Sequence, residues 1–319
     1  MIITRTPLRI SLFGGGSDFQ QFYKDNGGEV VSFTIDKSIY VSVNKRFDGN
    51  LHLRYSKTEI GKEPNDLKHD IVRECLKHVG IDGGVEIVIT SDVPSIGTGL
   101  GSSSALTVGL LKALFKYRFD IEKENYELAG IACKIEIEKV GSPIGIQDQF
   151  GCALGGFKWL SITKSGYVYP THLSMTDRFL NSIKLFYIPN GRSSSEILKN
   201  HIKNIQDGCS SQEENVALVK RFLEIWISGF TFEEFGRMLT QSWEIKKKCN
   251  MSTNPMVEKA FEVAKDYSFG GKMCGAGGGG FMILIDNGEN KLVSVMEEAG
   301  FKNTEFKIYQ KGSHIIYVG

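Results

Sequence analysis

Alternation of polar and apolar residues marks the start of the chain. Apolar Ile10 and Leu12 alternate with polar Arg9 and Ser11, and a period of two is typical of a strand with one buried face. The same signal predicts strands over 2–13, 51–55, 85–90, 183–188, 280–285, 304–309 and 313–318, and two strands within 30–47 that are separated near residues 36–37. Apolar residues three or four positions apart predict helices over 66–79, after residue 104, over 123–139, from about 193, two or three within 213–266, and over 290–299.

This mixture of elements favours an α+β fold, because strands lead both into other strands and into helices. The chain has 319 residues, a length that allows two domains. The pattern changes near residue 170. We therefore expect one domain over residues 1–170 and a second over residues 171–319.

The charge is nearly balanced, with 38 Lys and Arg against 37 Asp and Glu. A net charge of +1 provides no long-range attraction to nucleic acid or to an anionic membrane, so we expect neither as a partner. The six cysteines form no CxxC pair, which argues against a zinc or iron–sulfur site and favours a reducing compartment. No apolar run approaches the roughly 18 residues of a spanning helix, and arginines interrupt the N-terminal segment. These features predict a cytoplasmic protein.

Three glycine loops stand out: the first over 14–16, the second over 97–104 and the third over 275–280. The third matches GxGxxG, the pattern of dinucleotide-binding domains. That interpretation requires a strand before the glycines and a helix after them. Here the apolar strand 281–285 follows the glycines, so a dinucleotide-dependent oxidoreductase is disfavoured.

The second glycine loop has the composition of an anion site. Gly97, Gly99 and Gly101 precede three serines that open an apolar-periodic helix. A helix start carries free N–H groups and a positive dipole end, and glycines leave room for a phosphate. The serine hydroxyls could bind phosphate oxygens or a magnesium ion. They could also simply cap the helix, so the segment alone leaves both interpretations open.

Two acidic residues lie twelve positions apart, Glu136 on a predicted helix and Asp148 in the loop predicted to follow it. Phosphoryl transfer needs a cation across the nucleotide phosphates and a group that orients or deprotonates the accepting hydroxyl. One carboxylate for each task would meet that need. Glu136 also suits an exposed helix position and Asp148 a turn or cap, and spacing does not decide between these alternatives.

Four segments in this order resemble the GHMP kinase superfamily. They are residues 7–11, 94–103, 145–149 and 275–279. The family includes galactokinases, homoserine kinases, mevalonate kinases and phosphomevalonate kinases, and the resemblance extends from residue 3 to about residue 285. It implies an ATP-binding N-terminal domain like ribosomal protein S5 domain 2 and a ferredoxin-like C-terminal domain. ATP and substrate would meet in the cleft between them.

The resemblance also implies residue roles. Asp148 matches the catalytic aspartate, and Arg9 matches the basic residue that can keep it ionised and offset charge during transfer. Ser103 and Glu136 match the ligands of Mg²⁺, although an extra serine leaves the register open between Ser103 and Ser104. The third glycine loop is implied to pack its backbone against the helix that follows the second. The residues expected to bind the triphosphate are Gly97, Gly99, Leu100, Gly101, Ser102, Ser103 and Ser104.

The first glycine loop bears on the substrate. Galactokinase-like members carry Gly-Glu-His-Thr-Asp there, whereas this chain has Gly14–Phe19 with Asp18 nine positions after Arg9. By resemblance, Gly16, Ser17 and Asp18 bind the sugar. The missing Glu-His argues against galactokinase itself. The string is more similar to D-glycero-D-manno-heptose 7-phosphate kinases and, less closely, to the kinase part of fucokinases, which implies transfer from ATP to O1 of heptose 7-phosphate to give the 1,7-bisphosphate.

A phosphorylated sugar needs a second anion site, and the segment 190–196 is a candidate. It follows a predicted strand and begins a helix, so Arg192 and Ser193 could hold a phosphate. A capping box formed by Ser193 and Glu196 explains the same residues and is compatible with that role. Residues 54–60 are candidates for the adenine pocket by family position.

Two other functions remain open at this stage. One is a fucokinase- or galactokinase-like sugar 1-kinase. The other is a non-catalytic sugar sensor on the same fold, against which the retained Arg9, Ser103, Glu136 and Asp148 weigh.

Overall fold

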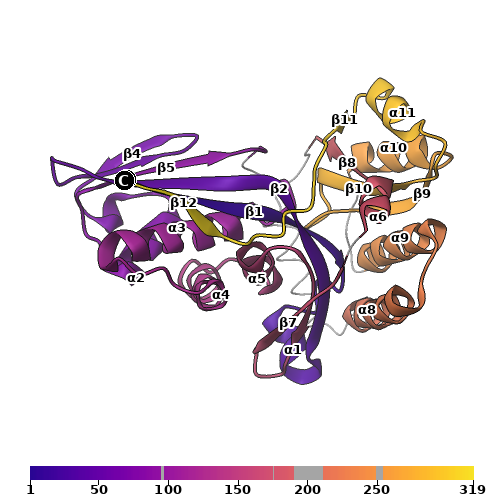
Figure 1. Ribbon diagram of the computed structural model, residues 1–319, viewed down its shortest axis with the longest axis horizontal. Coiled ribbons are helices and arrows are strands. Elements are labelled where there is room, and N and C mark those ends of the chain that lie inside the picture. Colours follow the sequence, from indigo (N-terminus) through magenta and orange to yellow (C-terminus); the bar gives the residue numbers. More distant parts are fainter. Residues whose placement is uncertain (95–96, 175, 190–210, 249–253) are drawn as a thin grey trace.

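The computed structural model describes residues 1–319 except 95–96, 175, 190–210 and 249–253. Two sheets, each with its own helices, lie at the two ends of the molecule (Figure 1). None of the helices in this described part combines the length and hydrophobicity that crossing a bilayer requires.

The first sheet is built on two long antiparallel strands, β1 (Ile2–Phe13) and β2 (Gly28–Lys45). The prediction of two strands within 30–47 is wrong, because β2 is continuous. The expected break survives only as a shift in the pairing with β1 between Pro7 and Arg9. One half of β2 pairs with β6 (Phe157–Ile162) and the other with β5 (Val85–Ser91). The remaining strands of this sheet are β3 (Leu51–Arg54), β4 (Thr58–Gly61), β7 (Val168–His172) and β12 (His314–Val318).

Helix α3 (Ser102–Phe119) packs on β1 and β2 and is buried along most of its length. Neighbouring helices cover it, which explains why its apolar residues are not confined to one face. The predicted helix over 123–139 begins at Asn125, and its second half is a π-helical turn (Lys134–Lys139). The neighbours of α3 are α2 (Asp70–Val79), α4 (Asn125–Cys133) and α5 (Gln147–Leu154), and two short helices, α1 (Gln20–Asn26) and the 3₁₀ turn Pro64–Asp66, complete this half.

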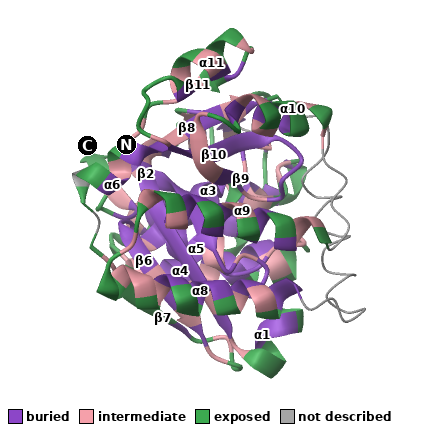
Figure 2. Ribbon diagram, turned by 90° about the vertical axis from the view of Figure 1, so that its right-hand side faces the viewer, coloured by how far each residue is buried: buried purple, intermediate pink, exposed green. Residues whose placement is uncertain are grey.

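The second sheet is antiparallel, in the order β11 (Lys302–Asn303), β8 (Ile183–Ile188), β10 (Gly280–Asp286), β9 (Ser268–Met273). Every residue of β10 is buried, and Figure 2 shows helices with exposed outer faces around the buried strands. These helices confirm the two or three predicted within 213–266. The helices of this half are α6 (Asp177–Ser182), α8 (Ser211–Ser228), α9 (Phe232–Lys248), α10 (Pro255–Ala264) and α11 (Leu292–Glu298).

The two halves are joined more closely than a division at residue 170 suggests. Strand β12 returns to the first sheet and pairs with β1, with Val318 opposite Ile2. The range 171–319 expected for the second domain therefore contains a strand of the first sheet. The apolar core is shared as well, since the ring of Phe13 lies 5.1 Å from that of Phe222 on α8 and 5.8 Å from that of Phe235 on α9.

Lys158, in the middle of the first sheet, gives a stability prediction. It is 1% exposed, and its ammonium has no hydrogen-bond partner among the described residues. Burial lowers its pKa to about 7, below the unfolded value, so the cost to folding is largest below pH 7 and vanishes above about pH 10. We expect Lys158→Met to raise the free energy of unfolding by about 1–4 kcal/mol at pH 7, with a smaller gain at pH 9.5, as measured by urea denaturation. The exposed control Lys164→Met should change little, and equal effects in both variants would contradict the prediction.

Candidate active site

The backbones of the second and third glycine loops touch. A Cβ added to Gly99 would lie 2.5 Å from the carbonyl oxygen of Cys274, and one added to Gly275 would lie 2.3 Å from the Cα of Gly99. The N–H of Phe281 donates to the carbonyl of Thr98 at 3.1 Å. Only glycine permits this approach, so the glycines hold the second sheet against the start of α3.

The start of α3 is open to an anion. Gly101 is the N-cap residue, with a φ of 75°, and no side chain among the described residues caps the helix. The interpretation of the serines as an ordinary cap is therefore wrong, since Ser102–Ser104 are the first helical residues. Ser103 is exposed and Ser104 is buried. Free N–H groups at the start of an 18-residue helix favour a bound anion.

Glu136 lies inside the molecule, not on an exposed helix face. Its carboxylate accepts hydrogen bonds from the Ser104 hydroxyl at 3.3 Å and from the Gln149 amide at 3.0 Å. Burial raises its pKa to about 7, and hydrogen bonds from Gln149, Ser104 and Ser103 partly offset that effect. The π-helical turn that carries Glu136 brings the carboxylate to the first turn of α3.

Arg9 joins Asp148 to the second glycine loop. Its Nε donates to Oδ1 of Asp148 at 2.8 Å, its Nη2 forms an ion pair with the same oxygen at 2.6 Å, and its Nη1 donates to the carbonyl of Gly99 at 2.8 Å. Its backbone N–H donates to the carbonyl of buried Leu100. Asp148 was expected in a loop but lies in the first turn of α5. Its Oδ2 has no hydrogen-bond partner in the described part of the chain.

Asp18 is buried beside these groups. Its carboxylate accepts from the backbone N–H of Gly16 at 3.0 Å and from the backbone and side-chain N–H groups of Gln147 at 3.1 and 2.9 Å. Burial, followed by the nearby charge of Asp148, raises its pKa to about 6. Ser17 is fully buried, and its hydroxyl bonds to Gly14 and Glu29, so in this structure it supports the loop.

Two lysines of the second half lie in the same region, and neither was predicted from the sequence. Lys246, in the last turn of α9, donates to the carbonyl of Gly275. Lys272, on β9, donates to the carbonyl of Leu12 at 2.7 Å. Burial lowers the pKa of Lys246 to about 8 and that of Lys272 to about 7. Lys246 gave no sequence signal, because lysines are common at the C-terminal end of a helix.

The roles of two further sets of expected residues stay predictions. Arg192 and Ser193 fall outside the described residues. Residues 54–60 form the hairpin of β3 and β4, in which Tyr55 donates to Glu59 at 2.7 Å, and their adenine role stays a prediction.

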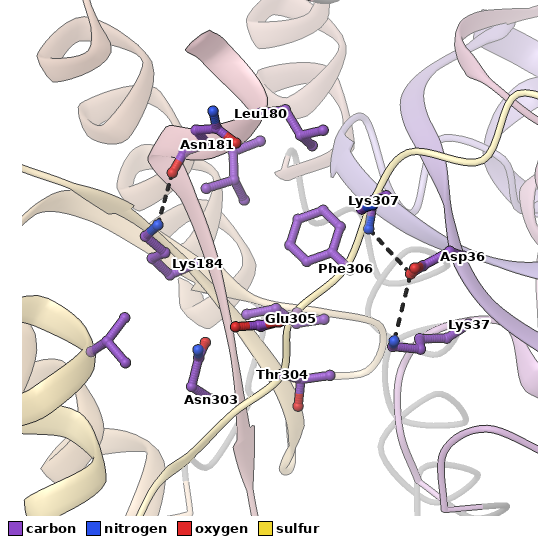
Figure 3. A pocket seen from close by; sticks show the side chains of 13 residues that line it. Asp36, Lys37, Leu180, Asn181, Lys184, Asn303, Thr304, Glu305, Phe306 and Lys307 are labelled. Carbon is purple, nitrogen blue, oxygen red and sulfur yellow. Dashed lines mark hydrogen bonds and ion pairs between the residues drawn. The ribbon is translucent and has the colours of Figure 1, made fainter. Parts of the chain in front are cut away.

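A pocket of about 460 Å³ lies where β2, β8 and the segment 303–307 meet (Figure 3). In it the backbone N–H of Lys307 donates to the Asp36 carboxylate at 3.1 Å, and Lys184 donates to the carbonyl of Asn181 at 2.9 Å. It shares no lining residue with the site formed by Arg9 and Asp148, so the two are separate features.

Comparison with known proteins assigns the family. The model of the GHMP kinases N terminal domain matches residues 67–156, and that of the GHMP kinases C terminal domain matches residues 220–302. The chain is 30% identical over 306 residues to D-glycero-alpha-D-manno-heptose 7-phosphate kinase of Campylobacter jejuni, covering 89% of each protein. It is 26% identical over 332 residues to L-fucokinase/L-fucose-1-P guanylyltransferase of Bacteroides fragilis, covering 88% of this chain and 34% of that protein.

Solved structures show the same fold. A D-glycero-D-manno-heptose 1-phosphate kinase from Bacteroides thetaiotaomicron superposes with a TM-score of 0.81 at 21% identity, over all of both chains. Lactococcus lactis galactokinase complexed with galactose gives 0.74 at 20% identity, over 99% of this chain and 95% of that one. The predicted two-domain α+β architecture is confirmed. The chain therefore belongs to the GHMP kinase family and is an ATP-dependent sugar kinase.

Proposed function

We propose that this kinase transfers the γ-phosphoryl group of ATP to the anomeric O1 of D-glycero-D-manno-heptose 7-phosphate, giving the 1,7-bisphosphate. The observation that carries the catalytic part is the bridge from Asp148 through Arg9 to Gly99. This bridge holds the carboxylate of Asp148, proposed to act on the acceptor hydroxyl, beside the second glycine loop, proposed to bind the phosphates. The similarity to the C. jejuni heptose 7-phosphate kinase supports the choice of sugar.

The second glycine loop is suited to the ATP phosphates. The helix start is uncapped, and Gly99 and Gly101 have positive φ values, so their backbone conformation leaves N–H groups rather than side chains at the site. We assign the triphosphate to the backbone N–H groups and hydroxyls of residues 97–104. Buried Leu100 contributes only its backbone.

The residues around Glu136 fit a magnesium ion. Mg²⁺ bound to nucleotide phosphates needs only one or two protein oxygens, and a buried carboxylate next to serine hydroxyls supplies them. Glu136 and Ser103 would hold the ion, with Ser104 holding Glu136 in place. When bound, the metal neutralises charge on the phosphates. No larger cluster of ligating side chains occurs in the described part of the chain.

Asp148 and Asp18 are assigned different roles toward the sugar acceptor. Asp148 accepts the proton of O1–H through its unpaired Oδ2, while Arg9 fixes the orientation of the carboxylate. Asp18 and Gly16 line the sugar side, within electrostatic reach of Asp148. Arg192 and Ser193 are proposed to bind the 7-phosphate.

A panel of acceptors tests the choice of sugar. With ADP release as the readout, we expect kcat/KM for heptose 7-phosphate to exceed that for free fucose, galactose or mevalonate by at least about tenfold, because a buried hydrogen-bonding site discriminates strongly. Arg192→Ala should raise KM for heptose 7-phosphate by about tenfold through loss of one charged contact. The exposed arginine variant Arg237→Ala on α9 is the control and should leave KM unchanged. Best turnover of free fucose or galactose would instead support the sugar 1-kinase alternative, which the similarity to the B. fragilis fucokinase favours.

A further inference from the structure

All three nitrogens of the Arg9 guanidinium already contact oxygen atoms of the protein. Its Nε and Nη2 bond to Asp148 and its Nη1 bonds to the carbonyl of Gly99. Arg9 is 3% exposed and held between these partners. It therefore acts mainly on the position of Asp148 and of the second glycine loop. The negative charge of a phosphoryl group in transfer calls for a cation with free N–H groups.

Lys246 is such a cation. It extends from the last turn of α9, which packs on β9 and also touches β1. Its ammonium donates to the carbonyl of Gly275, the glycine whose backbone touches Gly99. No other hydrogen-bond partner of Lys246 occurs among the described residues, so two of its three N–H groups are available to a ligand.

The surrounding charges favour an anion at this point. Lys246 lies within electrostatic reach of Arg9, Asp18 and Asp148, and it is close enough to Lys272 to contribute to the lowered pKa of that lysine. Asp148 already pairs with Arg9, and Asp18 already accepts from Gly16 and Gln147. Arg9, Lys246 and, when protonated, Lys272 thus bring up to three positive charges near two carboxylates that already accept hydrogen bonds from Arg9, Gly16 and Gln147. A phosphoryl group would balance the charge without displacing an existing bond.

We propose, on the basis of the proposed kinase function, that Lys246 binds the phosphoryl group in transfer, as a cation supplied by the second half of the molecule, whereas Arg9 is a positioning residue. In the reaction the O1–H proton passes to Asp148 and the bond between O1 and the γ-phosphorus forms. The bond from that phosphorus to the β–γ bridging oxygen breaks, and ADP leaves. Lys246 keeps its proton and its bonds throughout. Because Lys246 is carried by α9 and held to Gly275, this contact forms only while the third glycine loop is docked on the second.

Lys246→Met tests the proposal, with Lys246→Arg as the charge-retaining variant and Lys247→Met as the matched control. Lys247 is the next residue of α9 and pairs at the surface with Glu244 at 2.6 Å. We expect Lys246→Met to lower kcat by about 100-fold, the loss typical of one donor to developing negative charge. KM for ATP and for the sugar should change less than threefold, and the melting temperature should hold. Lys246→Arg should recover at least tenfold of the lost kcat, and Lys247→Met should match the wild type.

The opposite results would overturn the proposal. A Lys246→Met enzyme with wild-type kcat would remove Lys246 from the reaction. Equal losses in Lys246→Met and Lys246→Arg, accompanied by a lower melting temperature, would show that Lys246 only fastens α9 to the third glycine loop. If Lys246→Met does not fold, Lys246→Gln replaces it and is expected to show the same loss of kcat. The comparison uses whichever sugar the wild type phosphorylates best, so failure of the heptose assignment is distinguishable from failure of the role of Lys246.

Discussion

Asp148→Asn is expected to lower kcat by about 10²–10⁴-fold, the usual contribution of a general base. An amide cannot take the proton of the accepting hydroxyl, although its oxygen can still accept from Arg9 as the carboxylate does at 2.8 Å. The backbone that we assign to the ATP phosphates belongs to residues 97–104 and does not depend on the charge of Asp148. ATP affinity, measured by calorimetry, should therefore stay within about threefold of the wild type, while ADP release nearly stops.

The control for this variant is Asp120→Asn. Asp120 pairs with Lys116 on the surface and has a φ of 56°, a conformation that asparagine tolerates well. It should keep full activity. If Asp148→Asn kept more than a tenth of the wild-type kcat, Asp148 would not be the group that acts on the hydroxyl.

Gly99→Ala is expected to abolish most ATP binding, weakening the affinity at least tenfold and lowering kcat as well. The new Cβ would lie 2.5 Å from the carbonyl oxygen of Cys274, 2.7 Å from its carbon and 3.0 Å from the nitrogen of Gly275. All three are backbone atoms, so no side chain can rotate away. The loop would have to leave its place at the start of α3, and its φ of +72° adds about 1–3 kcal/mol of strain. Calorimetry with ATP and thermal unfolding measure the two effects.

Gly80→Ala separates crowding from backbone strain. Gly80 follows α2, has a φ of +74°, and has no atom within 4 Å of an added Cβ. This variant should lose about 1–2 kcal/mol of stability and bind ATP normally. Equal loss of ATP affinity in both variants would show that the contact between the two glycine loops does not hold the ATP site.

Local patterns in the sequence determined much of the first half of the molecule. The alternation over 2–13 predicts β1 with its bounds. The expectation of one buried face is wrong, because both faces of the strand are buried from Thr6 to Phe13 and polar Arg9 lies in the interior. The glycines and serines of 97–104 predict a helix start open to phosphate, because that feature depends on residues adjacent in the chain. The sequence pattern was too weak to predict several of the short helices and strands. Helix α5 was expected as a loop, and β4, β6, β7 and β9 were not predicted at all.

Only the tertiary structure decided how distant segments meet. Arg9 and Asp148 are 139 positions apart, and their ion pair depends on β1 lying beside α5. Glu136 lies in a run of charged residues that suggests an exposed helix, yet a π-helical turn directs it to α3. Lys246 lies in the last turn of α9, as many surface lysines do. Only the tertiary structure brings the third glycine loop against it. Local periodicity records which face of an element is buried, whereas the partner of a buried charge is set by packing between elements far apart in the chain.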